Sequence, residues 1–456
     1  MRANFLATLT ILTSIALAPD LAQTPAAFDR SGSRDFELIS VSNAGVQANQ
    51  DSDRAALSAD GRFVAFTSLA DNLVPGDTNF ASDIFVRDRV TDRIERVSVG
   101  PLGVEGDGNS GFLSLLGAPG ISADGRFVAF ASEASNFVAG DVPGTADVFV
   151  RDRRTGTTEL ISRGPDGFPA GGSVAPSISA DGRFVAFRSF SDQLVPDGNP
   201  NFFDHIYVFD RRREAMERVD VASDGTLADG GAFNLAISSD GRFVAFDSPA
   251  GNLVDGDGDQ AHDVFVHDRR TGRTEGISTR VPTDTFTGTS LLSSISADGH
   301  FVGFESDDPT LVRRDANGFF SDAFVFDREH PRLRLVSRNS DGVQGNNDSF
   351  GALVSADGRF VVFSSRASNL VRRDTNQSVD VFRRDLEKGT TERLVADDDI
   401  PDDRPFGFEV IATGITPDAD DVALLTRADL LPEQDVGFFA ADVYVFDSRR
   451  GHSGHD

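Results

Sequence analysis

The sequence of 456 residues contains no cysteine and no tryptophan. The absence of cysteine excludes disulfide bonds, thiolate metal sites and a cysteine nucleophile. Basic residues are also scarce, because 43 Lys and Arg stand against 72 Asp and Glu, which gives a formal net charge of −29. This charge argues against binding to nucleic acid, whose phosphates need a basic face, and against binding to an anionic membrane surface.

Several catalytic motifs are missing as well. The chain has no Gly-x-Ser-x-Gly nucleophile elbow, no phosphate-binding loop and no dinucleotide-binding fingerprint. Its seven histidines show no spacing that is typical of zinc ligands. These absences predict that the protein is not an enzyme.

Long hydrophobic runs are limited to the N-terminus. An apolar run follows Arg2 over residues 5–18, and small residues continue to Ala26. A run of about 14 residues fits a secretory signal peptide, whereas a transmembrane helix needs about 20 residues. We therefore expect a signal peptide at residues 1–27, a linker at 28–35, and export to the periplasm or the extracellular space. A buried N-terminal strand or helix is the alternative.

The sequence is rich in turn-forming residues, and it contains a repeated segment. Asp far outnumbers Glu, and there are 44 Gly, which favours many tight turns and short strands. The segment 58–66, Ser-Ala-Asp-Gly-Arg-Phe-Val-Ala-Phe, recurs with a period of about 59 residues. The aspartates that mark its seven copies are Asp60, Asp124, Asp181, Asp240, Asp298, Asp357 and Asp418.

Each period carries four strand signals. In the first copy they are a short apolar stretch before Asp60-Gly61, then residues 62–68, 83–88 and 93–99. Four antiparallel strands that repeat radially describe a β-propeller blade. The seventh copy ends after its third strand at Asp447, and an orphan fourth strand stands at residues 36–42.

The fold predicted from this count is all-β. It is a seven-bladed propeller over residues 36–447, in which the N-terminal strand completes the last blade, followed by a flexible tail at 448–456. Joining the two ends in this way removes open strand edges. We expect the ring to be monomeric.

The repeat also resembles a known family. Its Ser-x-Asp-Gly-Arg-Phe-Val-Ala-Phe motif is similar to the TolB-like, WD40-like propeller repeat, whose hallmark is Ser-Pro-Asp-Gly-Lys before an apolar strand; here Ala usually replaces Pro. The resemblance covers nearly all of the chain after residue 35. It implies a propeller related to periplasmic interaction scaffolds and to the propeller halves of serine peptidases.

The loops between the second and third strands are candidate Ca²⁺ sites. Asp and Asn alternate in them, so that several side-chain oxygens converge, and Ca²⁺ prefers six to eight oxygen ligands. Structural Asx turns that cap the third strand are the competing interpretation. The candidate ligands are Asp77, Asn79, Asp83, Asp257, Asp259, Asp263, Asp315, Asn317, Asp322, Asp374, Asn376 and Asp380, and the pairs Asp141–Asp147 and Asp197–Asp204 are partial versions.

Two functions remain open from the sequence. Uniform blades, a polar rim and the missing catalytic motifs favour a binding scaffold, with a protein or peptide partner on that rim and with Ca²⁺ as a stabilising ion if the Asp/Asn-rich loops bind it. The alternative is a propeller hydrolase or lyase that acts on a carbohydrate or peptide, with rim carboxylates as general acid and base.

Overall fold

The computed structural model describes residues 36–111, 117–257, 260–279, 288–312, 315–372, 374, 378–395, 409–427, 430–431 and 440–449. The expected signal peptide, the linker and most of the expected tail lie outside the described residues. In the part that is described, no helix has both the length and the apolar character needed to cross a membrane.

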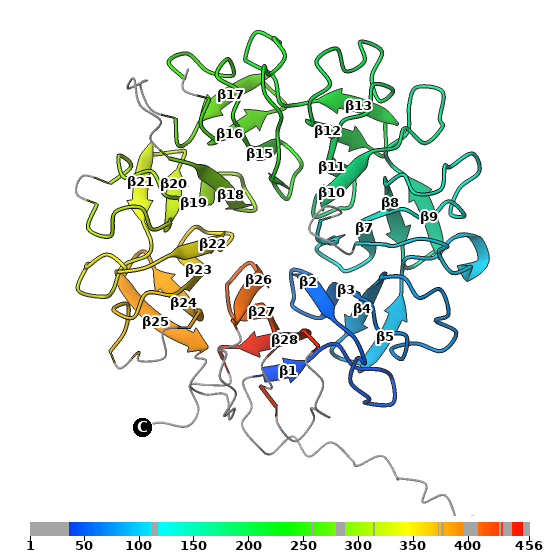
Figure 1. Ribbon diagram of the computed structural model, residues 1–456, viewed down its shortest axis with the longest axis horizontal. Coiled ribbons are helices and arrows are strands. Elements are labelled where there is room, and N and C mark those ends of the chain that lie inside the picture. Colours follow the sequence, from blue (N-terminus) through cyan, green and yellow to red (C-terminus); the bar gives the residue numbers. More distant parts are fainter. Residues whose placement is uncertain are drawn as a thin grey trace, which may run out of the picture. The chain divides into compact units, whose positions relative to one another are not determined.

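Within the described residues, twenty-eight strands form seven four-stranded antiparallel sheets, which follow one another around a ring (Figure 1). Blade 1 consists of β2 (Ser52–Leu57), β3 (Phe63–Ser68), β4 (Asp83–Asp88) and β5 (Arg93–Arg96). Blade 2 consists of β6 (Gly120–Ile121), β7 (Phe127–Ser132), β8 (Asp147–Asp152) and β9 (Thr157–Leu160). Blade 3 consists of β10 (Ser173–Ile178), β11 (Phe184–Ser189), β12 (His205–Asp210) and β13 (Ala215–Arg218).

The remaining blades repeat this order. Blade 4 consists of β14 (Leu235–Ile237), β15 (Phe243–Ser248), β16 (Asp263–Asp268) and β17 (Arg273–Gly276). Blade 5 consists of β18 (Ser290–Ile295), β19 (Phe301–Ser306), β20 (Asp322–Asp327) and β21 (Arg332–Leu335). Blade 6 consists of β22 (Ser349–Val354), β23 (Phe360–Ser365), β24 (Asp380–Asp385) and β25 (Thr390–Val395). Blade 7 consists of β26 (Ile411–Ile415), β27 (Asp421–Thr426), β28 (Asp442–Asp447) and β1 (Phe36–Leu38).

Blade 7 confirms the predicted closure of the ring. β1 pairs antiparallel with β28, and Phe36 lies opposite Phe446. Their rings are 5.4 Å apart, so the closing pair is also joined by an aromatic contact. The predicted fold class, a seven-bladed all-β propeller, is therefore confirmed.

The hydrophobic core lies between the blades. Each of seven clusters of buried side chains draws residues from two adjacent blades. Between blades 1 and 2, for example, Val86 packs with Phe130 and Phe149. Each buried Phe stabilises the fold by roughly 1.5–3 kcal/mol relative to an exposed one. The second strand has buried residues on both faces because a blade covers it on each side.

The repeated Ser-x-Asp-Gly-Arg segment forms the hairpin between the first and second strands. Ser58 Oγ donates to Asp60 Oδ1 at 2.7 Å and accepts from the backbone N–H of Phe63 at 2.9 Å. Gly61 has φ +67°, a value that favours glycine. Arg62 then donates two hydrogen bonds to Asp88, at 2.9 and 2.7 Å. The repeated Asp and Arg residues are therefore structural.

A second repeated contact joins neighbouring blades. We call it the interblade clamp: the Arg that follows the third strand binds a Glu in the fourth strand of the preceding blade. Arg153 of blade 2 donates to Glu95 Oε1 of blade 1 at 2.6 Å and to the Gly125 carbonyl, and it lies 4.4 Å from the centroid of the Phe63 ring. The other clamps are Arg89–Glu37, Arg211–Glu159, Arg269–Glu217 and Arg328–Glu275.

Candidate functional site

The two ends of the ring differ in their loops. The loops from the second to the third strand, and those from the fourth strand to the next blade, form one end, which we call the acidic rim. The hairpins between strands one and two and between strands three and four form the other end, which we call the hairpin rim. The predicted Ca²⁺ ligands that the structure describes belong to the acidic rim or are the first residue of the third strand.

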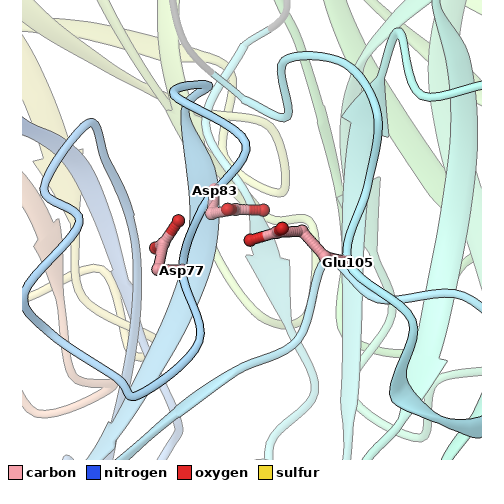
Figure 2. Close-up of side chains that lie close together, drawn as sticks. All are labelled: Asp77, Asp83 and Glu105. Atoms are coloured by element: carbon pink, nitrogen blue, oxygen red, sulfur yellow. The ribbon is translucent and has the colours of Figure 1, made fainter.

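In blade 1 the structure brings three carboxylates together. Asp77 lies in the loop before β4, Asp83 begins β4, and Glu105 comes from the loop that leads to blade 2 (Figure 2). Oxygen atoms of the three lie within 4.8 Å of one another. Asp77 and Asp83 were predicted as ligands from the sequence. Glu105 was not predicted, because it is more than twenty residues away along the chain.

A fourth side chain, Arg96 of β5, supplies the positive charge for these carboxylates. Its Nη1 atom is 3.2 Å from Asp77, 3.0 Å from Asp83 and 2.6 Å from Glu105. Burial, together with the charge of Asp83, raises the pKa of Asp77 to about 6, although Arg96 opposes this rise. The guanidinium occupies the position between the oxygens, so a Ca²⁺ ion in this blade would have to displace it.

Asn79 illustrates the turn interpretation of these loops. Its Oδ1 accepts the backbone N–H of Ala81 at 2.9 Å, while its amide nitrogen donates to Asp83 and to the Gly106 carbonyl. The oxygen that Ca²⁺ would need therefore closes an Asx turn.

Blades 5 and 6 also bring a nitrogen donor to their predicted ligands. In blade 5, Gln344 Nε2 donates to Asp315, Asn317 and Asp322 at 2.9, 3.0 and 2.6 Å. In blade 6, Arg393 Nη1 lies 3.8 Å from Asp374 and 3.0 Å from Asp380. In blade 4, Asp263 Oδ1 accepts from Ser278 at 2.5 Å and Asp257 is half-buried. Asp259 and Asn376 lie outside the described residues.

Blade 2 is the exception to this arrangement. Asp147 at the start of β8 is fully buried, and its Oδ1 accepts from Ser162 and from the backbone N–H of Gly171. Its Oδ2 and the Oδ2 of Asp141 are both buried without a hydrogen-bond partner. Burial and the neighbouring charge of Asp141 raise the pKa of Asp147 to about 7. No described basic side chain forms an ion pair with either residue.

A residue just beyond the fourth strand forms a hydrogen bond that was not predicted from the sequence. A serine just beyond that strand donates to the first Asp of the third strand; Ser98 to Asp83 and Ser337 to Asp322 are examples. Blade 3 exchanges the pair, because His205 replaces the Asp and Asp220 replaces the Ser, with Nδ1 and Oδ2 2.6 Å apart. The serine recurs at one position in several repeats, which is a signal in the sequence that pointed to it.

Exposed hydrophobic side chains gather on the acidic rim. Among the described residues, every large hydrophobic side chain that is exposed lies there except Val90. They are Val46, Phe80, Leu102, Val104, Val142, Phe168, Phe190, Phe202, Phe203, Phe319, Phe320 and Val343. Phe80, Phe202 and Phe319 follow the Asp/Asn turns of blades 1, 3 and 5 and are 91%, 82% and 91% exposed. The rim predicted from the sequence was acidic and polar, and these exposed hydrophobic residues were not part of that prediction.

At one position on this rim the blades carry different side chains, some of them charged. Equivalent positions near the end of the second strand carry Arg188, Asp247 and Glu305 in blades 3, 4 and 5. Asp247 is fully buried, and its Oδ2 lies 3.5 Å from Nδ1 of His262, which is half-buried. Burial raises the pKa of Glu305. An imidazole oriented by a buried carboxylate is an arrangement that supports proton transfer.

Comparison with known proteins gives structural neighbours only. No protein-family model and no curated protein sequence matches the chain. Among solved structures, an oligogalacturonate lyase in complex with manganese matches at 11% identity and a TM-score of 0.52, covering 90% of this chain and 96% of the lyase. The acylaminoacyl peptidase of Pyrococcus horikoshii matches at 13% identity and a TM-score of 0.51, covering 87% of this chain and 51% of the peptidase.

A third neighbour bears on the predicted family. TolB from Acinetobacter baumannii matches at 15% identity and a TM-score of 0.38, covering 76% of this chain and 64% of TolB. That score is too low to support an argument, so the TolB-like assignment still depends on the repeat motif.

These neighbours correct one expectation from the sequence. The prediction that the chain is not an enzyme is wrong as drawn, because a lyase matches this fold along 96% of its own length and a peptidase matches it along 51% of its own length. The physical reason is that a propeller can carry catalytic groups in loops that do not follow the repeat, so uniform blades do not exclude them. What the comparisons establish for this chain is its architecture, that of a seven-bladed β-propeller.

Proposed function

We propose that the protein is an exported propeller that binds a protein or peptide partner through its acidic rim. The observation that carries this proposal is the unequal distribution of exposed large hydrophobic residues, which, among those that the structure describes, lie on the acidic rim apart from Val90. Soluble proteins rarely expose grouped apolar side chains without an interaction that covers them. Aromatic side chains are also common among the residues that dominate binding energy.

The backbone of two of these loops supports the same proposal. Phe80 has φ +56° and Phe202 has φ +59°, in the left-handed region that bulky residues seldom adopt. Such a conformation costs of order 1–3 kcal/mol and is concentrated at functional sites. The Asx turn at Asn79 holds Phe80 in this conformation with its ring in solvent.

The charge of the rim indicates the kind of partner. Carboxylates such as Asp71, Asp107 and Asp197 lie in the same loops as the exposed hydrophobic residues. An acidic surface with apolar contacts fits a partner that presents basic and apolar side chains, and the charge would increase its rate of association.

The experiment is affinity capture from the native cell envelope, followed by binding measurements with the purified partner. A triple variant, Phe80→Ser with Phe202→Ser and Phe319→Ser, should fold normally and weaken binding at least tenfold. Val90→Ser, on the hairpin rim, is the matched control and should bind as the wild type does. Equal binding by the triple variant would contradict the proposal. N-terminal sequencing of the mature protein tests export, since cleavage near residue 27 is expected.

The proposal includes a Ca²⁺ ion in blade 2. Asp141 and Asp147 interact with each other there, and each has a buried oxygen with no hydrogen-bond partner outside this pair. In blades 1, 5 and 6 an Arg or Gln nitrogen serves the corresponding oxygens. A divalent ion would satisfy both carboxylates, and water would complete its coordination.

A second candidate function is cleavage of a carbohydrate or peptide on the same rim. The pair of Asp247 and His262 favours it, because the pair is found in one blade only and the imidazole is accessible. Incubation with panels of polysaccharides and peptides tests it: new sugar ends or new amino termini should appear with the wild type and not with His262→Ala. If the wild-type protein produces no new sugar ends or amino termini from any member of the panels, this candidate is excluded and the proposed binding function is unaffected.

A further inference from the structure

The interblade clamp is missing between blades 5 and 6. Arg334 lies opposite Val325 in the sheet register, where blade 1 has Glu95 opposite Val86. Leu386 follows the third strand, where blade 1 has Arg89. At this junction the acidic partner is thus replaced by a cation, and the basic partner is replaced by a hydrophobic residue.

A cavity of about 600 Å³ lies at this junction, on the hairpin-rim side. Its lining contains five arginines and one carboxylate: Arg332, Arg334, Arg338, Arg359, Arg384 and Glu387. This is a strong local excess of positive charge in a chain whose net charge is −29.

Most of this charge has no acidic partner. Arg359 is paired with Asp385 at 2.7 Å and lies 3.4 Å from Glu387. Among the described residues, no carboxylate forms an ion pair with any of the other four arginines. Arg334 Nε is buried without a hydrogen-bond partner.

Arg384 shows that this charge is not compensated. Its Nη1 donates only to neutral oxygens, the carbonyls of Arg338 and Asn339 and the hydroxyl of Thr391. Burial, followed by the charge of Arg338, lowers the pKa of Arg384 to about 10. Because guanidinium groups stay charged in proteins, an anion in the cavity would relieve this repulsion.

The corresponding cavity between blades 1 and 2 provides an internal comparison. Its volume is about 700 Å³, and Asp88, Glu95 and Arg153 are in its lining. There, Glu95 and Arg153 pair with each other, and Asp88 pairs with Arg62. Both junctions therefore have a cavity, and the charge of its lining distinguishes the one between blades 5 and 6.

We propose that the cavity between blades 5 and 6 binds a small molecule with two or more anionic groups, either phosphates or carboxylates. Its volume falls in the range of ordinary ligand sites, and arginine binds both kinds of group through paired hydrogen bonds. This site lies on the opposite rim from the proposed partner-binding surface and is independent of it.

Calorimetric titration with pyrophosphate and with citrate, at ionic strength matched with NaCl, tests the proposal. The decisive variant is Arg334→Glu with Leu386→Arg, which rebuilds the clamp that five other junctions contain. It should fold with an unchanged or higher Tm and bind the tighter of the two anions at least tenfold more weakly. The anion that the wild type prefers identifies the source as a phosphate or a carboxylate.

A second pair of variants covers the case in which the double variant does not fold. Arg332→Gln removes an exposed arginine of the cavity and should weaken anion binding about threefold or more at constant Tm. Arg273→Gln, at the equivalent position in blade 4, should leave binding unchanged. Absence of binding by the wild type, or equal binding by the wild type and by the clamp or Arg332→Gln variant, would overturn the proposal.

Discussion

Arg153 and Glu95 join two blades through a hydrogen bond of 2.6 Å, although they are far apart in the sequence. The same arginine also binds a backbone carbonyl and covers the ring of Phe63. Arg153→Ala should therefore lower the free energy of unfolding by about 1–3 kcal/mol, because it removes a partly buried hydrogen bond to a carbonyl and a cation–π contact. Glu95→Gln should cost less than about 1 kcal/mol, since Glu95 is half exposed. Denaturation in urea measures the loss of unfolding free energy for each variant. Equal losses for Arg153→Ala and Glu95→Gln would contradict this prediction and show that the ion pair dominates.

Arg96 is expected to be essential to the stability of blade 1. Arg96→Met leaves Asp77, Asp83 and Glu105 facing one another without a positive charge, and should cost about 3–5 kcal/mol in the presence of a chelator. Millimolar Ca²⁺ should restore part of that loss, since an ion that binds only the folded state stabilises it. Thermal unfolding with EDTA and with CaCl₂ measures the effect. A variant that melts at the same temperature in both conditions would contradict this prediction.

In the wild type, the Ca²⁺ effect should come from blade 2. The Tm should rise when Ca²⁺ replaces EDTA, and Asp147→Asn should abolish the rise because it removes one of the two buried oxygens that lack a partner. Asp322→Asn in blade 5 is the matched control and should keep the Ca²⁺ response. If the wild type shows no shift, the metal proposal is wrong.

Acid should unfold the protein through its repeated Arg–Asp pairs. Hydrogen bonds from Arg62 and Arg126 hold the pKa of Asp88 and of Asp152 well below the usual range. A folded-state pKa below the unfolded value gives stability that is fully present above about pH 4 and is lost as the pH falls further. Stability should therefore decrease steeply from about pH 4 downward. Asp88→Asn should be less stable at pH 7 and should lose less between pH 4 and pH 2, as acid titrations followed by circular dichroism would show.

Phe80 should be dispensable for folding. Its side chain is 91% exposed and its backbone is in the left-handed region, so Phe80→Gly should be neutral or stabilising by up to about 1 kcal/mol. Phe85, which is fully buried in β4, is the contrast, because Phe85→Ala should cost about 3–5 kcal/mol. Urea denaturation distinguishes the two, and a large loss for Phe80→Gly would mean that the ring packs against the fold.

The repeat predicted the architecture because each copy is a local unit. In blade 1 the third strand covers 83–88 as expected. The fourth strand is shorter than the expected 93–99, because it ends at Arg96. The contacts of Arg96 were not predictable in the same way, since they depend on which face of the fourth strand turns inward. The predicted site consisted of Asp and Asn residues from the loops and from the start of the third strand, and it included no cation from another strand. Exposed phenylalanines were missed because apolar residues were assigned to strands.

The pairing of β1 with β28 imposes an order of events on the synthesis and folding of the chain. β1 emerges first, yet its partner emerges last, so Phe36–Leu38 must stay unpaired until nearly the whole chain is available. During that interval β1 is an unpaired strand that is able to pair with another chain. A chaperone that holds β1 would protect its edge, and a chain truncated before Asp442 would never be able to close the ring.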